Sequence, residues 1–526
     1  MRGGTTAGAA GAAMALLALA VPAAADGAQP DLSRFYSQRL VWGGCTVKDA
    51  PKGMECAELT VPIDYARPED GTIALAVARV RAAESGEGPT GTGTGAAPAR
   101  AGAPKGSLVL NFGGPGESGL KGLGDFMADT ARLAPAYDLV TFDPRGVGRS
   151  APVRCGAEAE EVIEGSSGSV PADDAEGRAQ LVEELRAVAE GCRRTTGKLL
   201  PYVGTINASR DLDVLRRALG DRKLNYFGIS YGTRLGAVYA AQFPRRTGRM
   251  VLDAVDSLTA DAARSAFAQA TAFQKALDTF LSDCAARGAR CPLGASTARA
   301  AGTLDATVAR LERAGAKTAS GADFTSADLR TALTDALYAE QLWPTLARGI
   351  AALHDKGDPA LLEEITRQFA GKDTRSGRTE DDNSREALLA VNCADDPVRA
   401  KDPAAELASL EARFAKASPM FGPEQAGAAI SCTGWPAGTD FIRSIHRTGA
   451  PPALLIGTRG DPATPYPWAA ETARRLGKGV VLTYEGEGHG GYTASQCVRD
   501  AADAFLLDGV LPAAGTSCAR ETPPQR

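Results

Sequence analysis

The chain has 526 residues, with 58 Lys and Arg against 63 Asp and Glu, ten Cys and three His. This length suits one large domain or a core with an insert, and the 44% hydrophobic content is that of a globular protein. A formal charge of −5 without a long basic run argues against nucleic-acid binding, and the three scattered His argue against a His-rich metal site.

The first 25 residues predict an export signal. The lone Arg2 precedes an apolar stretch over 12–21, and Ala23-Ala24-Ala25 fits a cleavage site before Asp26. A membrane anchor is the alternative, but this stretch has about half of the ~20 residues that a span needs. We therefore expect a secreted protein with no membrane attachment after cleavage.

Ten Cys in an exported chain predict disulfides, although the sequence leaves their connectivity open. The simplest expectation joins neighbours in order, because short loops close at a low entropic cost. The pairs are then Cys45–Cys56, Cys155–Cys192, Cys284–Cys291, Cys393–Cys432 and Cys497–Cys518. The absence of a C-x-x-C motif argues against a zinc ribbon or a thioredoxin-like redox site.

Short apolar runs alternate with helical segments along most of the chain. A strand is expected at 72–80, before a Gly-, Ala-, Thr- and Pro-rich tract over 84–106 that is typical of a surface loop. Further runs follow at 107–112, 138–142, 224–229, 249–255, 453–458 and 480–484. Runs of this kind are typical of parallel strands buried on both faces, so the alternation predicts an α/β fold.

The alternation stops in an Ala-rich interval with helical periodicity and no convincing strand. We interpret this interval as a helical cap. Helices are expected there at 260–287, 296–314, 326–353 and 359–369. The expected organisation is a signal peptide (1–25), the first part of an α/β core (26–256), the cap insert (257–439) and the C-terminal part of the core (440–526).

The strongest local signal is Gly228-Ile229-Ser230-Tyr231-Gly232. This G-x-S-x-G motif follows an expected strand and begins an expected helix from Tyr231 to Phe243, which is the context of a nucleophile elbow. The glycines allow the tight turn that raises a Ser hydroxyl above the end of the sheet. An ordinary turn is the alternative reading, because the bare motif is common.

A Ser nucleophile needs a base, and the base needs an orienting carboxylate. His489 is the expected base because it lies in a glycine-rich loop directly after the strand at 480–484. His354 falls within the cap, and His446 precedes a strand. Asp461, after the strand at 453–458, is the expected acid, with Asp253 and Asp256 as competitors.

Two backbone N–H groups are expected to form an oxyanion hole. One is that of Tyr231, which follows the Ser, and the other is expected in the glycine-containing stretch 111–119, directly after residues 107–110 of the apolar run. A phosphate-binding loop is the alternative reading of these glycines, but no Lys-Ser/Thr pair follows at the required spacing.

Together the motifs resemble the proline-iminopeptidase and tripeptidyl-aminopeptidase branch of the α/β-hydrolases. The resemblance is carried by GGPGESG (113–119), FDPRGVGRS (142–150), NYFGISYGTRLGAVYAAQFP (225–244), NCADDP (392–397), GTRGDPATP (457–465), GEGHGGY (486–492) and DGVLPAAGTSC (508–518). It implies an α/β-hydrolase fold, the triad Ser230, Asp461 and His489, and the oxyanion donors Gly114 and Tyr231. Two positions depart from the pattern: Phe112 stands where a His is usual, and Glu117 stands where a Gly is common.

The resemblance implies a serine aminopeptidase that releases short peptides, tripeptides above all, from free N-termini without a metal or cofactor. A carboxylate would bind the substrate ammonium by charge-assisted hydrogen bonds. The candidates are Glu117, Asp395 and Asp396, for which a helix end or an ion pair with Arg399 is the structural alternative. We expect a monomer that acts on peptide or protein N-termini.

Other functions remain open. A secreted carboxylesterase or lipase would use the same triad. A non-enzymatic binding protein on this scaffold would be expected to lack one of the three residues, and a dehalogenase would have Asp in place of Ser230.

Overall fold

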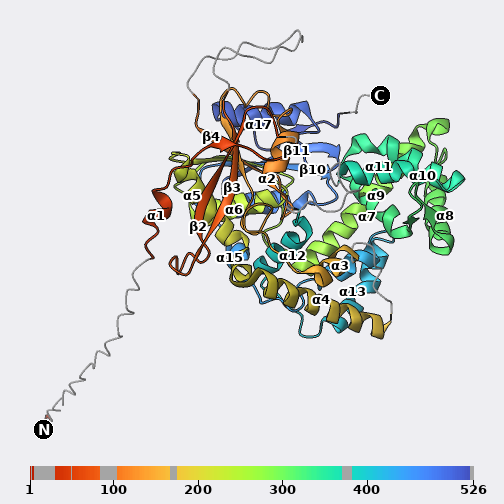
Figure 1. The fold of residues 1–526 in the computed structure, drawn as a ribbon, viewed down its shortest axis with the longest axis horizontal. Helices are drawn as coiled ribbons and strands as arrows, with labels where there is room; N and C mark the ends of the chain where they lie inside the picture. Colours follow the sequence, from red (N-terminus) through yellow and green to blue (C-terminus); the bar gives the residue numbers. More distant parts are fainter. Residues whose placement is uncertain are drawn as a thin grey trace.

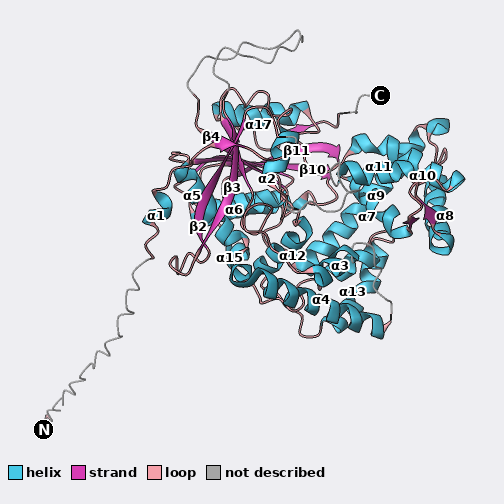
Figure 2. Cartoon of the chain, viewed as in Figure 1, coloured by secondary structure: helices cyan, strands magenta, loops and turns pink. Residues whose placement is uncertain are grey.

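The computed structural model describes residues 1, 3–4, 30–48, 50–82, 104–165, 174–369 and 382–521 (Figure 1). The expected signal peptide and the tract over 84–106 lie almost entirely outside these residues. A sheet with helices around it forms one part of the molecule, and a mainly helical part lies beside it (Figure 2).

A ten-stranded sheet, in the order β1-β2-β3-β5-β4-β6-β7-β10-β11-β12, runs through the described part of the chain. The strands from β5 to β12 in this order pair in parallel, whereas β1, β2 and β3 form an antiparallel edge. The bounds are β1 Gly43–Gly44, β2 Met54–Pro62, β3 Thr72–Val80, β4 Ser107–Asn111, β5 Asp138–Phe142, β6 Leu224–Ile229, β7 Thr247–Asp253, β10 Ala453–Gly460, β11 Gly479–Glu487 and β12 Ser517–Cys518.

The strands expected from apolar runs are all present, within one to three residues at each end. The central strand β4 is buried along its whole length, as a strand covered on both faces must be. The residues from about 31 to 81 predict a strand-rich segment without delimiting β2, whose exposed and buried residues alternate along part of its length. This alternation fits an antiparallel edge with one solvated face.

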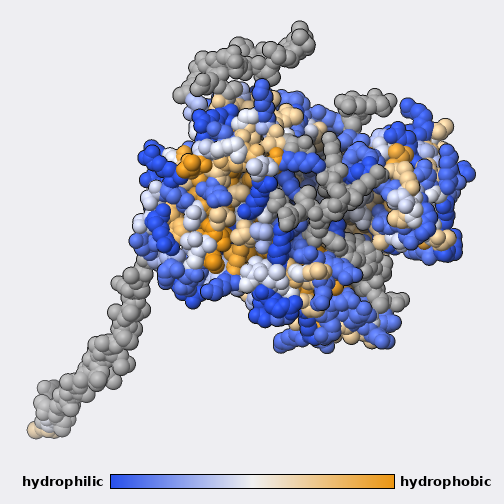
Figure 3. All heavy atoms as spheres, in the orientation of Figure 1, coloured by the Kyte–Doolittle hydropathy of each residue, from blue (hydrophilic) through white to orange (hydrophobic). Residues whose placement is uncertain are grey.

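Helices cover both faces of the sheet. Apolar side chains of α5, α6 and α16 pack on one face, and those of α2 and α17 pack on the other. The helices of this part are α1 Ser33–Tyr36, α2 Gly119–Phe126, α3 Ala157–Gly165, α4 Ala175–Thr196, α5 Thr205–Ala218, α6 Tyr231–Gln242, α16 Pro467–Leu476 and α17 Gln496–Asp508, with a 3₁₀ turn at Gly197–Tyr202. In the view of Figure 3, hydrophobic side chains gather over the antiparallel edge, and the rest of this face is mainly hydrophilic.

The chain between β7 and β10 forms the helical insert, and its helices within residues 262–369 share an apolar core separate from that of the sheet. Its elements are α7 Ala262–Ala286, α8 Thr297–Ala314, β8 Ala316–Lys317, β9 Asp323–Phe324, α9 Ser326–Leu337, α10 Trp343–Lys356, α11 Ala360–Phe369, α12 Ser384–Asp395, α13 Pro403–Ala417, α14 Gly422–Ala428 and α15 Phe441–Ser444, with 3₁₀ turns at Gly288–Arg290 and Glu340–Leu342. The short hairpin of β8 and β9 was not predicted. The helix expected at 326–353 is divided into α9 and α10, because the chain turns before Pro344 restarts a helix.

Five disulfides join the neighbouring pairs expected from the sequence, namely Cys45–Cys56, Cys155–Cys192, Cys284–Cys291, Cys393–Cys432 and Cys497–Cys518. Among the described residues, no helix is long and apolar enough to cross a membrane.

Candidate active site

Ser230 forms a sharp turn between β6 and α6. Its backbone has φ 56° and ψ −125°, a left-handed conformation that a side-chain-bearing residue rarely adopts. The neighbouring glycines are required by packing, since a Cβ on Gly228 would lie 2.4 Å from the Gly232 carbonyl oxygen and one on Gly232 would lie 2.6 Å from that of Asn111. The turn therefore holds the partly buried Ser230 at the N-terminus of α6, where the helix dipole favours negative charge.

His489 and Asp461 form a hydrogen-bonded pair. The Nδ1 atom of His489 lies 2.9 Å from Oδ1 and 3.1 Å from Oδ2 of Asp461. The Asp461 side chain is buried, and it also accepts hydrogen bonds from the backbone N–H groups of Ala463 and Thr464 and from the Thr464 hydroxyl. This arrangement fixes the imidazole and directs its Nε2 away from the carboxylate.

The surroundings of His489 favour its charged form. Burial alone would lower the pKa of the imidazole, but the Asp461 charge and hydrogen bond outweigh burial, and Asp253 and Asp256 add to the effect. The pKa of His489 is therefore raised above its ordinary value of 6.5. Within the described chain, no hydrogen bond joins Ser230 to His489, a contact that often tightens only when substrate is bound.

The loop Gly113–Gly119 lies directly against Ser230. A Cβ on Gly113, which has φ +104°, would lie 2.9 Å from the Ser230 Cβ and 2.8 Å from the Ile229 carbonyl oxygen, so only glycine fits. The Gly113 N–H is bound to the Asn111 side chain. Among the described residues, the N–H groups of Gly114 and Tyr231 donate to no other group, so both are available to a bound oxyanion.

Glu117 is a solvent-accessible carboxylate on the same loop. Surrounding protein nevertheless desolvates it, which raises its pKa, and the charge of Asp382 adds to this rise while that of Lys121 opposes it. Of the three carboxylates expected to bind a substrate amine, Glu117 has the surroundings that suit the role.

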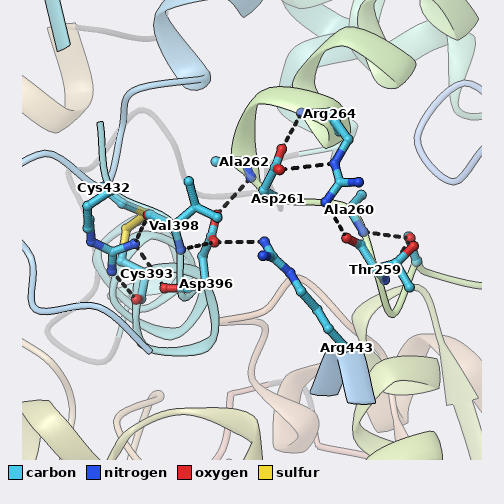
Figure 4. A network of polar contacts seen from close by, with 12 residues as sticks. Thr259, Ala260, Asp261, Ala262, Arg264, Cys393, Asp396, Val398, Cys432 and Arg443 are labelled. Atoms are coloured by element: carbon cyan, nitrogen blue, oxygen red, sulfur yellow. Dashed lines mark hydrogen bonds and ion pairs between the residues drawn. A yellow bond between two sulfur atoms is a disulfide. The ribbon is translucent and has the colours of Figure 1, made fainter. Parts of the chain in front are cut away.

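Asp395 and Asp396 are bound by contacts within the protein instead. Asp395 accepts hydrogen bonds from the Thr205 N–H at 2.8 Å and the Thr205 hydroxyl at 2.5 Å, and it lies 3.5 Å from Arg234. Asp396 accepts from the backbone N–H groups of Ala262 and Val398 and from Arg443 (Figure 4). Both carboxylates are thus held by partners within the protein, which favours the structural alternative over the expected role at the substrate.

The structural alternative for these aspartates was an ion pair with Arg399, but the described contacts of the Arg399 guanidinium are with carbonyl oxygens, including those of Cys393 and Asp396. The ion pairs involve Arg234 and Arg443 instead.

The competing acids and bases lie in other contacts. Asp253 accepts from backbone N–H groups of the His489 loop, and Asp256 is paired with Arg234 at 2.7 Å. His354 is hydrogen-bonded to the exposed Asp355, and His446 is exposed. Within the described residues, none of the four side chains forms a hydrogen bond to Ser230 or His489.

Tyr338, directly after α9, is a contact of the site that sequence reasoning missed. Its carbonyl oxygen accepts a hydrogen bond from the His489 N–H at 2.8 Å, and its ring meets the imidazole edge-on with centroids 5.0 Å apart. Burial and the charges of Asp461, Asp335 and Glu117 raise the pKa of Tyr338. No sequence signal links residues so far apart, so only the fold reveals that the insert contacts the His489 loop.

The described residues contain no group of three or more His, Cys, Asp or Glu side chains that could hold a metal ion. What the arrangement offers is a Ser at a strained turn, an acid–imidazole pair, and unbound N–H groups beside them. These are the parts needed for acyl transfer through a covalent intermediate.

Comparison with known proteins agrees with this arrangement. Residues 418–518 match the family model described as TAP-like protein. The chain is 33% identical over 503 residues to the serine protease Hip1 of Mycobacterium tuberculosis, with 91% of each chain covered. It is also 33% identical over 512 residues to the tripeptidyl aminopeptidase of Streptomyces lividans, with 95% of this chain and 90% of that protein covered. The chain belongs to the TAP-like family of α/β-hydrolases.

The TAP-like chain is therefore an enzyme, a serine hydrolase of the peptidase type with an α/β-hydrolase fold. Relatives with another printed activity also match it. A carboxylesterase B of Mycobacterium tuberculosis is 33% identical over 475 residues, which cover 88% of this chain and 86% of that protein.

Proposed function

We propose that this enzyme is an exported serine aminopeptidase that hydrolyses peptide bonds near free N-termini and releases short peptides, with tripeptides as the expected product. The observation that carries the proposal is the solvent-accessible carboxylate of Glu117 on the loop that packs against Ser230. The names of the Hip1 and tripeptidyl aminopeptidase relatives support a peptide substrate.

In the proposed reaction, Ser230 is the nucleophile and His489 is the base. The imidazole Nε2 takes the hydroxyl proton while Ser230 attacks the peptide carbonyl, and Asp461 stabilises the imidazolium. The N–H groups of Gly114 and Tyr231 bind the oxyanion. His489 then gives its proton to the leaving amine, and water, deprotonated by the same imidazole, hydrolyses the acyl-enzyme to release the short peptide.

Glu117 is proposed to bind the ammonium group of the substrate. It lies on the oxyanion loop, so an N-terminus bound there would be held at a fixed spacing from the scissile carbonyl. Such an anchor favours removal of a peptide of set length over internal cleavage.

The test compares a tripeptide anilide that has a free amine with its N-acetylated form. We expect the free-amine substrate to have a kcat/KM higher on the order of 10- to 100-fold, since hydrogen bonds to charged groups contribute about 1.5–3 kcal/mol. Glu117→Gln should remove most of this preference, whereas Glu58→Gln, on the exposed side of β2, should keep it.

A carboxylesterase is the second candidate, favoured by the 33% identity to carboxylesterase B. Equal rates on the free and acetylated anilides, together with faster cleavage of a simple ester, would reject the aminopeptidase in its favour.

Export is the remaining part of the proposal. Five disulfides among the described residues are typical of an oxidising compartment, and the N-terminal sequence fits an export signal. Expression of the full chain in a host with an export pathway should yield a secreted product whose N-terminal sequence begins near Asp26.

A further inference from the structure

Asp253, at the end of β7, connects the Ser230 turn to the His489 loop. Its carbonyl oxygen accepts the Ser230 N–H at 3.0 Å. Its carboxylate accepts the Gly491 N–H, at 3.0 Å to Oδ1 and 3.1 Å to Oδ2, and the Tyr492 N–H at 2.9 Å. One residue therefore holds both catalytic segments, one by its main chain and the other by its side chain.

The His489 loop needs such a support. Gly488 has φ +94° and Gly490 has φ +90°, so the two neighbours of His489 lie in a region that only glycine occupies readily. Glycines leave a loop with more conformational freedom than other residues. Contacts from outside the loop must then fix it, and Asp253 supplies them from the core while the Tyr338 carbonyl supplies one from the insert.

The hydrogen-bond pattern favours an ionised Asp253. Both carboxylate oxygens accept from N–H donors, and the side chain is only 2% exposed. Burial raises the pKa of Asp253, but the Gly491 and Tyr492 N–H groups and the charge of His489 oppose this rise. The groups whose charges act on His489 are Asp461, Asp253 and Asp256, and the Tyr338 ring faces it from the insert.

We propose that Asp253 is a positioning residue for the reaction, which sets the His489 loop against the Ser230 turn and supplies a second negative charge that stabilises the imidazolium. The carboxylate in contact with the His489 ring is that of Asp461. Asp253 therefore acts indirectly, through its hydrogen bonds to the His489 loop and through the electrostatic effect of its charge on the imidazole. This inference rests on the proposed roles of Ser230 and His489.

The test uses Asp253→Asn and Asp253→Ala in the full-length enzyme. In Asp253→Asn, one oxygen can still accept both N–H groups, but the charge is lost and the amide nitrogen faces the Gly491 N–H. We expect kcat to fall on the order of 10- to 100-fold with KM nearly unchanged, because small displacements of catalytic groups reduce rates by such factors. The fall should be larger for Asp253→Ala.

The pH profile separates this role from a merely structural one. A neighbouring anion raises the pKa of His489, so its removal lowers that pKa, and the acid limb of kcat/KM should move to lower pH in Asp253→Asn. Asp256→Asn is the matched control. It removes a charge that also acts on His489 but makes no contact with the loop, so it should shift the limb while the plateau kcat stays within about threefold of wild type, since no catalytic group is displaced.

A labelling control distinguishes a failure of this proposal from a failure of the proposed function. Labelling of the wild-type enzyme by a fluorophosphonate tests the Ser nucleophile, so an unlabelled wild type would refute the proposed function rather than the role of Asp253. A labelled wild type with an Asp253→Asn variant of unchanged kcat and pH profile would overturn the role of Asp253.

If the variants fail to fold, amide hydrogen exchange of the wild type tests the contacts between Asp253 and the His489 loop. The Gly491 and Tyr492 amides should be strongly protected, because both are bound to a buried carboxylate. Rapid exchange at these two amides in the folded enzyme would also overturn the role of Asp253.

Discussion

At the scale of single residues, Ser230 is defined by its backbone as much as by its hydroxyl. Its φ of 56° is held by the fit of Gly228 and Gly232 against their neighbours, so the strained turn does not depend on the hydroxyl itself. Ser230→Ala should therefore keep the fold and lose nearly all turnover, on the order of 10³-fold or more. Anilide hydrolysis with a thermal melt of the same sample checks this, and retention of a tenth of the wild-type rate would refute the proposed nucleophile.

The acid limb of the activity profile should report the pKa of His489. The enzyme needs the neutral imidazole, and Asp461 raises the pKa of that imidazole, so activity should fall with decreasing pH from a point above 6.5. Asp461→Asn removes the raising charge and should move the limb to lower pH while reducing kcat by about 10⁴-fold. A limb that stays in place in this variant would show that another group controls the profile.

The sequence points to the proposed catalytic residues more clearly than to the residues that hold them in place. Ser230, Asp461 and His489 are marked by glycine-rich motifs after strands, and the structure brings the acid and the imidazole into contact. The support by Asp253 depends on the pairing of β7 with β6 and β10, which no local pattern encodes. Asp395 was expected at the substrate because of its sequence motif, but the buried Thr205 and Arg234 take its hydrogen bonds.

At the scale of elements, the end of α9 is part of the candidate active site. The Tyr338 ring packs edge-on against His489, and contacts of this kind contribute about 0.5–1.5 kcal/mol. Tyr338→Ala should lower kcat by about 2- to 10-fold, whereas Tyr338→Phe keeps the ring and should behave nearly as wild type. Steady-state kinetics of the two variants measure the difference, and equal rates would show that the ring does not hold the imidazole.

Elements with a strong local pattern are predicted well, and their interruptions are not. The parallel strands follow directly from apolar runs, and α7, α8 and α11 begin and end within two residues of the expected helices. The break between α9 and α10 was missed because the apolar periodicity continues through it. This break matters, since it is what turns Tyr338 toward the His489 loop.

At the scale of the whole molecule, one cluster of polar contacts joins three helices of the insert, α7, α12 and α15 (Figure 4). Asp396 joins the start of α7 to the end of α12 and to Arg443 of α15, and the Cys393–Cys432 disulfide lies beside it. Segments of the insert that are far apart in the sequence are thus joined at Asp396. Because apolar side chains of α12 and α15 also pack into the core beside the sheet, the cluster should hold the start of α7 in place against that core.

The Cys393–Cys432 disulfide should stabilise the fold more than Cys284–Cys291, which also lies in the insert. Cys393 and Cys432 are 39 residues apart, and Cys284 and Cys291 are 7 apart. The chain-entropy model then assigns about 1.5 kcal/mol more stabilisation to the longer loop. Replacement of both cysteines by Ser should lower the melting temperature more for Cys393–Cys432 than for Cys284–Cys291. The opposite order in calorimetry would contradict the larger stabilisation by Cys393–Cys432.

The hydrogen bond from the His489 N–H to the Tyr338 carbonyl has a consequence for engineering. Exchanging the insert for that of a relative would also exchange the backbone acceptor that holds the N–H of His489, the proposed general base. The insert and the loop that carries His489 are therefore not structurally independent in this enzyme. A functional chimaera must keep a backbone carbonyl at that point, whatever side chains it presents to the peptide.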